Sequence, residues 1–156
     1  MISVDSRFSA FYRYLTCNQV DPDEWSEPQP EDQGSDYESA VVRRGSHLWR
    51  IRTARVTPTK PGAFVAVWER DPSPGGTTWP FHTNDGTDGL LVFVEDQQRF
   101  GVFEFTPDLL SRLKVTPSDD RPGKRGFRVY PEWCGALNKS AERAQALQAT
   151  AFQRIV

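Results

Sequence analysis

Apolar residues along this chain first follow a helical period and then change to the period of strands. Phe8, Phe11, Tyr12 and Leu15 recur at intervals of three and four, which predicts an amphipathic helix over residues 6–17. Further along, short apolar runs are separated by turn-forming residues, a pattern typical of strands and hairpins. The expected strands cover residues 40–44, 48–56, 63–68, 90–94, 100–105 and 126–130.

Two more helices complete the predicted fold. Thr106 followed by Pro107 is a helix start, and it predicts a short helix ending at Leu113. Asn138 is the expected cap of a last helix, whose apolar stripe consists of Ala141, Ala144, Leu147, Ala151 and Ile155. This order of elements predicts one α+β domain over residues 1–156, with a central, mainly antiparallel sheet flanked by helices.

Charge is distributed unevenly along the chain. Residues 1–38 hold two arginines and nine acidic residues, whereas residues 39–156 hold seventeen basic and twelve acidic residues. Within the acidic leader, residues 21–35 combine three prolines with many carboxylates. This composition opposes both helix and sheet, so we expect an exposed, mobile, acidic and proline-rich connector after the first helix.

The cysteines and the apolar runs of the chain indicate which cellular compartment to expect. The chain has two cysteines, Cys17 and Cys134, without the spacing of a metal or redox motif, and two free thiols are the simpler interpretation. It has no secretion leader and no apolar run near the length that spans a bilayer. We therefore expect a cytoplasmic protein with no membrane contact.

Three sequence blocks have long and unusual motifs. They are Asp36-Tyr-Glu-Ser-Ala40 with Arg50 to Val65 and Trp68; Gly123-Lys-Arg-Gly-Phe-Arg-Val-Tyr-Pro-Glu-Trp133; and Asn138-Lys-Ser-Ala141 with Gln145, Gln148 and Phe152. These blocks resemble the MepB family, and with the strands between them they cover about residues 36–153. The family is named after a member encoded beside a multidrug efflux pump, and no established reaction comes with the name. The resemblance implies a fold similar to restriction-endonuclease-like domains, with DNA or RNA as the ligand. Arg55 replaces the usual lysine of the family and Cys134 a frequent aspartate.

Basic residues are concentrated in these blocks and are the candidate ligands of phosphate groups. They are Arg50, Arg52, Arg55, Lys60, Lys124, Arg125, Arg128 and Lys139. Arg50 and Arg52 share one face of a strand, and the turn 122–126 adds backbone N–H groups beside its two cations. In the alternative interpretation this is a solvated sheet face whose arginines pair with Glu69, Glu104 or the acidic leader.

Aromatic residues lie next to the basic set in the sequence. Trp68, Tyr130 and Trp133 are the candidates for stacking on the bases of a single strand. In the alternative interpretation they are core residues, as most strand tryptophans are.

These features favour a non-enzymatic domain that binds nucleic acid or another phosphate ligand, without a cofactor or metal ion. Two alternatives stay open. One is a metal-dependent nuclease or phosphoesterase that uses Asp36, Glu38 or Glu69, although no Glu-x-Lys pair stands on the predicted strands. The other is a protein-interaction module linked to drug-resistance physiology, with an unknown partner. His47 and His82 lack the spacing of metal ligands.

Overall fold

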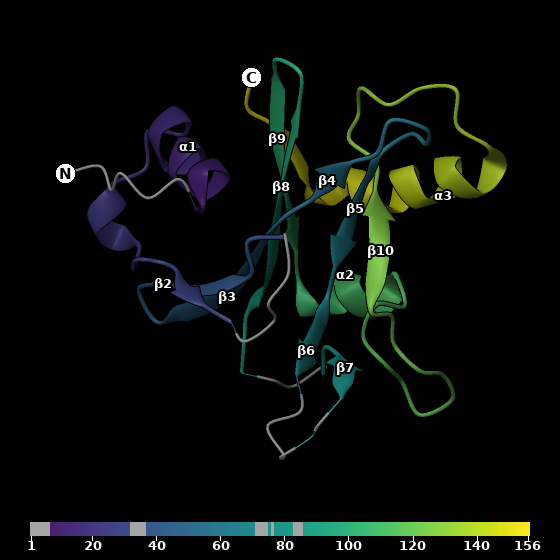
Figure 1. Cartoon of the computed structure of the whole chain (residues 1–156), viewed down its shortest axis with the longest axis horizontal. Helices are drawn as coiled ribbons and strands as arrows, with labels where there is room; N and C mark the ends of the chain where they lie inside the picture. The colour runs from purple at the N-terminus through teal and green to yellow at the C-terminus, as the bar shows by residue number, and fades with distance from the viewer. Residues whose placement is uncertain (1–6, 32–36, 71–74, 76, 83–85) are drawn as a thin grey trace.

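A six-stranded sheet, sheet A, forms the centre of the computed structural model, which describes residues 7–31, 37–70, 75, 77–82 and 86–156 (Figure 1). All neighbouring strands are antiparallel except β3 and β8, which are parallel. The sheet is therefore mainly antiparallel, as predicted. Its strands lie in the order β1 (Gln29–Pro30), β2 (Ala40–Arg44), β3 (His47–Thr53), β8 (Gly89–Asp96), β9 (Arg99–Phe105) and β11 (Phe152–Arg154).

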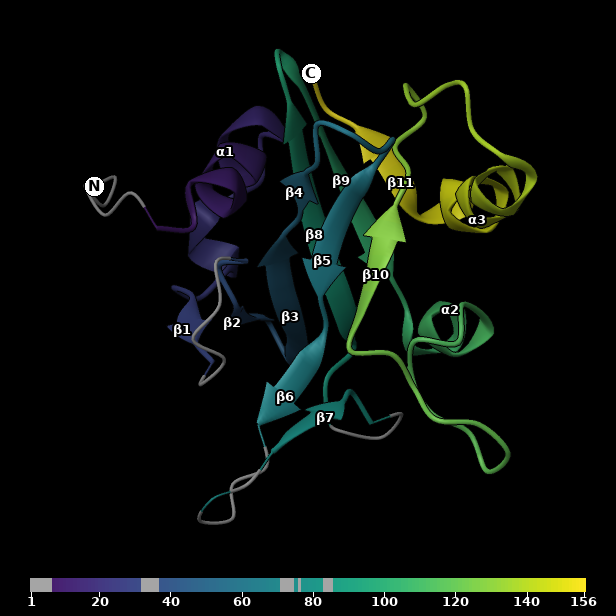
Figure 2. The ribbon, with the colours of Figure 1, turned by 45° about the vertical axis from the view of Figure 1, so that its right-hand side comes forward.

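A second, three-stranded sheet, sheet B, packs over part of sheet A (Figure 2). Two predicted strands are each divided between sheets. The segment 48–56 forms most of β3 and all of β4, and the segment 63–68 forms β5 and the first residue of β6. The first division falls at Ala54, which is buried between the sheets and donates its N–H to the carbonyl of Phe93 on β8. Sheet B has the order β10 (Gly126–Val129), β5 (Ala63–Ala66) and β4 (Arg55–Val56), while β6 (Trp68–Arg70) pairs with β7 (Thr78–Pro80).

Helix α1 (Ser9–Cys17) covers the other face of sheet A. Its residues Phe11, Tyr14 and Leu15 are buried against Ile51 and Phe93 of the sheet. Phe11 and Leu15 belong to the helical period of the sequence, and Tyr14 joins them in the buried contact. The first predicted helix is therefore confirmed.

Helices α2 (Pro107–Arg112) and α3 (Lys139–Gln148) lie on the same side of sheet A as sheet B (Figure 2). The core between these layers includes Val92 and Phe103 from sheet A and Val65 and Phe127 from sheet B. The α+β architecture, with helices flanking a central sheet, is as predicted. In the described part of the chain, no helix is long and apolar enough to cross a membrane.

The last predicted helix is capped as expected but ends early. Asn138 accepts the N–H three residues ahead at 2.8 Å, which starts α3. Leu147 is 43% exposed and does not belong to the packed face. Buried Gln148 packs there instead, because its amide accepts the N–H of Tyr130 at 2.9 Å and donates to the carbonyl of Arg128 at 3.0 Å. The chain then leaves the helix and forms the edge strand β11. The predicted apolar stripe is therefore wrong at Leu147, while Ala141 is buried and Ala151 and Ile155 pack against the core.

The described part of the acidic connector, residues 21–31, is mostly exposed but is anchored to the fold by Trp25 and by strand β1. Trp25 is buried, with its ring edge-on to those of Phe11 and Tyr14 of α1. The following residues form β1, which pairs with β2 at the edge of sheet A. The expectation of an exposed connector is therefore wrong at Trp25, because its indole completes the core beneath α1, whereas most of its described neighbours are exposed as expected. Residues 32–35 of the predicted connector lie outside the described part.

Candidate functional site

Arg50 and Arg52 share one face of β3, as predicted, but this face points into the protein. The Arg52 side chain is fully buried and the Arg50 side chain is 10% exposed. The Arg52 Nε–H donates to the carbonyl of Ala66 on β5 at 3.2 Å, and Arg50 lies 3.0 Å from the carboxylate of Glu69 on β6. The expectation of a solvated face on this strand is therefore wrong, because β5 and β6 cover it.

Both guanidinium groups converge on Glu31, which follows β1 in the acidic leader. Arg50 donates to Glu31 Oε2 at 2.6 Å. Arg52 donates to Oε1 at 2.6 Å and to Oε2 at 3.1 Å. With Glu69, the cluster holds two arginines and two glutamates, so its formal charges balance. The alternative interpretation of the sequence was that these arginines pair with Glu69, Glu104 or the acidic leader. The structure agrees with it for Glu69 and for Glu31 of the leader.

The environment of this cluster holds the arginines in place. Burial lowers the pKa of Arg52, while the hydrogen bonds and charge of Glu31 act in the opposite direction. The guanidinium groups of Arg50 and Arg52 also lie 4.3 and 5.2 Å from the ring centre of Phe81. Both cations are thus occupied within the fold. A phosphate group would have to compete with Glu31 and Glu69 for them.

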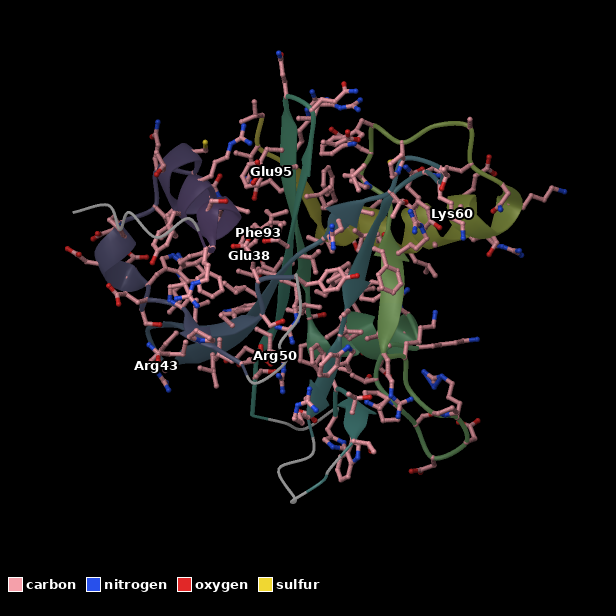
Figure 3. The ribbon with its side chains drawn as sticks, viewed as in Figure 1. Glu38, Arg43, Arg50, Lys60, Phe93 and Glu95 are labelled. Atoms are coloured by element: carbon pink, nitrogen blue, oxygen red, sulfur yellow. The ribbon has the colours of Figure 1, made fainter. Side chains whose placement is uncertain are left out.

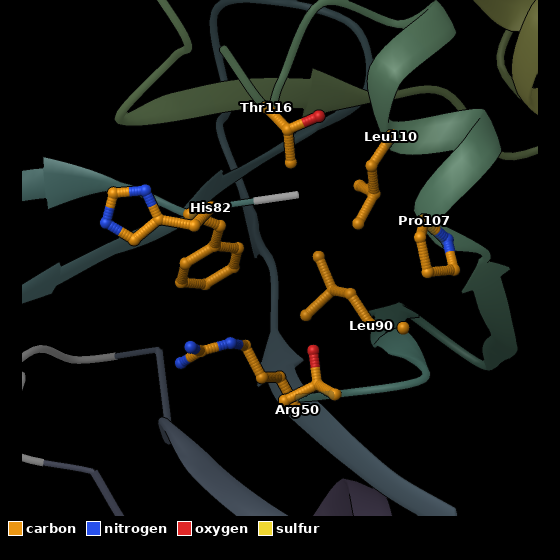
Figure 4. Close-up of a pocket in the computed structure, with 9 residues that line it drawn as sticks. Arg50, His82, Leu90, Pro107, Leu110 and Thr116 are labelled. Atoms are coloured by element: carbon orange, nitrogen blue, oxygen red, sulfur yellow. The ribbon is translucent and has the colours of Figure 1, made fainter. Parts of the chain in front are cut away.

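A small cavity opens beside this cluster (Figure 4). Its volume of about 10 Å³ is close to the space that one water molecule needs. His82 closes one side, with Nε2 at 3.4 Å from Glu69 Oε1. The cavity is therefore too small for a nucleotide or sugar. Its lining includes Arg50, Phe81, His82, Leu90, Leu110 and Thr116.

The carboxylates considered for metal-dependent hydrolysis have other contacts. Glu69 pairs with Arg50, and the carboxylate of Glu38 accepts the backbone N–H of Phe8 at the start of α1. Asp36 lies outside the described residues. Within the described ranges, no group of three or more His, Cys, Asp or Glu side chains is placed to hold a metal ion. Glu38 and Glu69 thus each contact a partner within the fold.

Cations and aromatic rings meet on the outer face of sheet B. Arg55 of β4, Phe64 of β5 and Arg128 of β10 are direct cross-strand neighbours. Val65 and Val129 point into the core, so the alternation of side chains places this row outward. Arg55 is exposed, and the other two are half-buried. Two predicted ligands thus flank the aromatic ring of Phe64, a residue that was expected in a strand but was not among the candidate ligands.

Two tyrosines and two glycines extend this outer face. Tyr130, one residue beyond β10, has its ring against Gly62, where a Cβ atom would come within 2.8 Å of it. At Gly126 a Cβ atom would lie 2.4 Å from the ring of Phe64. The ring of Tyr37 meets that of Phe64 edge-on, with centres 6.1 Å apart. The glycines therefore let two rings lie close to the backbone of the sheet.

The turn between β4 and β5 supplies the remaining contacts of this face. Arg128 donates to the carbonyl of Pro61 at 3.0 and 3.2 Å and to the hydroxyl of Thr57, so its guanidinium group is held beside the turn. Lys60 is exposed in the same turn. Figure 3 shows Lys60 well apart from Arg50. The outer face of sheet B hence carries three predicted cations, and the buried cluster carries two others.

The basic turn and Trp68 lie at the far end of the β5–β6 segment. Arg125 donates to the carbonyl of Thr78 on β7 at 2.9 Å, and Lys124 beside it is exposed. Trp68 on β6 is half-buried and lies 5.5 Å below the guanidinium group of Arg70. These residues are separate from the row at Phe64.

Trp133 and Lys139 lie apart from these residues, and no contact joins them to each other among the described residues. The Trp133 ring lies 5.2 Å from the guanidinium group of Arg99 and 5.7 Å from that of Arg154. Its indole N–H donates to Asp96 at 3.2 Å. Lys139 is exposed at the start of α3. The structure therefore separates most of the predicted ligands and brings Arg55, Lys60, Arg128 and Tyr130 together.

Comparisons with known proteins place the chain in a family. A family model described as MepB-like matches residues 31–154. The chain belongs to the MepB-like family. It is also similar to a solved structure, the crystal structure of MepB, with 28% sequence identity and a TM-score of 0.80 over 94% of this chain and 97% of that one. None of the curated proteins compared with the chain matches it. The matched part of this MepB-like chain contains both the buried cluster from Glu31 onward and the outer face of sheet B.

Proposed function

We propose that the chain binds single-stranded nucleic acid across the outer face of sheet B, as a binding protein without catalytic activity. The observation that supports this proposal is the row in which Phe64 lies directly between Arg55 and Arg128. A base can stack on the ring, since every base has a π-face, while the guanidinium groups meet phosphates on either side. Sheets with outward aromatic rings serve this purpose in other RNA-binding domains.

A single strand suits this face better than a duplex does. In a duplex the base faces are stacked on one another, so a ring on a sheet cannot reach them. The half-buried Phe64 also sits on a rigid strand, paired on both sides, which keeps its ring oriented without a large loss of freedom on binding. The contacts of Arg128 with Pro61 and Thr57 have the same effect on that cation.

The salt dependence of binding tests this proposal. Arg55, Lys60 and Arg128 are expected to contact phosphates, and each contact with a single strand contributes a slope of roughly −0.7 in log affinity against log salt. The wild type should therefore show a slope of about −2. Fluorescence anisotropy with a labelled single-stranded oligonucleotide of mixed sequence measures it.

A double variant and a matched control sharpen this test. Arg55→Ala with Arg128→Ala should make the slope shallower by about 1.4. Arg43→Ala is the control, because Arg43 is exposed on β2 and lies far from Lys60 (Figure 3). An unchanged slope in the double variant, or no binding to any single strand at low salt, would remove the support for this function.

A further inference from the structure

A cavity lies just beyond the edge of sheet B, between the end of β10 and helix α3. Its volume is about 270 Å³, slightly below the roughly 300 Å³ at which pockets for drug-sized ligands begin. Two aromatic side chains, Tyr130 and Phe152, contribute to its walls, and Ala146 and Ala149 contribute small apolar surfaces from the helix side. A flat group of the size of one nucleobase fits such a space.

The polar groups of this cavity are dominated by hydrogen-bond acceptors. Glu132 and Glu142 line it and bring two carboxylates. Gln145 also lines it, but its amide nitrogen donates to the carbonyls of Pro131 at 2.9 Å and Cys134 at 3.1 Å. The oxygen of that amide is then the atom left for a ligand. Such a cavity favours a ligand whose edge consists of N–H donors.

The cavity is continuous with the outer face of sheet B through Tyr130, which belongs to both. Tyr130 lies two residues beyond Arg128, on the same side of the sheet, because side chains of a strand alternate. A strand of nucleic acid that stacks on Phe64 and passes Arg128 therefore arrives at the cavity. Lys139, exposed one helical turn before Glu142, adds a cation that can offset the repulsion between the carboxylates and phosphates.

We propose that this cavity takes one base of the bound strand and selects guanine, an inference that rests on the proposed function. Guanine presents two adjacent donors, its ring N–H and its amino group, which one carboxylate can accept together. Cytosine and adenine place an acceptor nitrogen beside the amino group, and this nitrogen is repelled by a carboxylate. Thymine and uracil offer one N–H between two carbonyl groups.

Oligonucleotides that differ at one base test this selection. The probes are labelled single strands of thymidines with one central guanine, one central cytosine or no replacement, and anisotropy gives their affinities. The strand with guanine should bind roughly ten-fold more tightly than the other two, within the range for a bidentate contact to a base. A central inosine, which lacks the amino group, should lose most of this gain.

The double variant Glu132→Gln with Glu142→Gln should abolish the preference and retain binding to thymidines. Glu95→Gln is the matched control, since Glu95 is exposed on β8, away from α3 (Figure 3). Equal affinity for all strands, or a guanine preference that survives in the double variant, overturns the inference and leaves the proposed function intact. Absence of any binding to single strands is the separate failure of that function. An oligoarginine peptide supplies a further outcome. If it binds tightly while no oligonucleotide does, and the double variant loses this binding, the cavity takes an arginine side chain of a protein and the inference is overturned.

Discussion

Glu31 accepts hydrogen bonds from Arg52 on both of its carboxylate oxygens, at 2.6 and 3.1 Å, inside the protein. This contact joins the acidic leader to the centre of sheet A. Buried ion pairs add little net stability compared with apolar residues, but removal of one partner leaves an uncompensated buried charge. The leader is therefore an integral part of the fold. The effect of the leader's charge must be tested by single substitutions. Deletion of the whole leader would also remove the core residues of α1.

Replacement of Glu31 by alanine should strongly destabilise the protein. Arg50 and Arg52 would then share Glu69 alone, and we expect a loss of about 3–5 kcal/mol in the free energy of unfolding. Urea denaturation of Glu31→Ala measures this loss. Glu95→Ala is the control, since Glu95 forms an exposed pair with Arg13 and should cost less than about 1 kcal/mol. A loss as small as that of the control would contradict the role given to Glu31.

Trp25 provides a test of the packed connector. Its indole is 8% exposed and lies against two rings of α1, so Trp25→Ala should cost about 3–5 kcal/mol in unfolding free energy. Trp79, which is 41% exposed on β7, supplies the comparison. Trp79→Ala should change stability by no more than about 0.5 kcal/mol. If the two variants unfold at the same urea concentration, this part of the leader is not packed as described.

Gln148 joins α3 to the end of β10 through its side-chain amide. Gln148→Ala would leave the N–H of Tyr130 and the carbonyl of Arg128 without these bonds, at about 1–3 kcal/mol for a group that stays buried and unsatisfied. Thermal unfolding should therefore show a clear decrease in melting temperature. Leu147→Ala, at an exposed position on the same helix, should have little effect. A larger effect at Leu147 than at Gln148 would restore the apolar packing face predicted from sequence.

Tyr14 makes the stability of the folded protein depend on pH in the alkaline range. Burial raises its pKa above the ordinary value of 10.0, while the hydrogen bond to Asn18 lowers it. The unfolded chain then ionises this phenol at a lower pH than the folded one does. The stabilisation is complete below the unfolded pKa, about 10, and is lost as the pH rises through the folded pKa. As the pH rises from the unfolded pKa through the folded pKa, the stability of the wild type should therefore fall more steeply than that of Tyr14→Phe. Equal slopes would show that Tyr14 titrates alike in both states.

The local features of the fold could be predicted from the sequence, because they depend on neighbouring residues. Alternation located the strands, and Thr106 and Asn138 marked two helix starts by the hydrogen bonds that they accept. Alternation also placed Arg50 and Arg52 on one face. Whether that face is solvated depends on β5 and β6, which cover it and are distant in sequence. No local pattern shows this.

The candidate site was predictable to a smaller extent for the same reason. Arg55 and Arg128 could be named as candidate ligands, but their position on either side of Phe64 depends on the strand order of sheet B. One local signal was present at Phe64, since it is out of phase with Ala63, Val65 and Val67, which are fully buried. An apolar residue between inward neighbours on a strand indicates an outward aromatic ring.

The most direct test of the central claim is the affinity of Phe64 variants for a single-stranded oligonucleotide. Stacking of one base on an aromatic side chain contributes roughly 1–3 kcal/mol, so Phe64→Leu, which keeps an apolar side chain but no ring, should weaken binding roughly 5- to 150-fold. Phe64→Tyr keeps the ring and should bind like the wild type. Trp79→Ala removes an exposed aromatic residue outside sheet B and should leave the affinity unchanged. If Phe64→Leu binds single strands as tightly as the wild type, the outer face of sheet B does not stack bases and the account is contradicted.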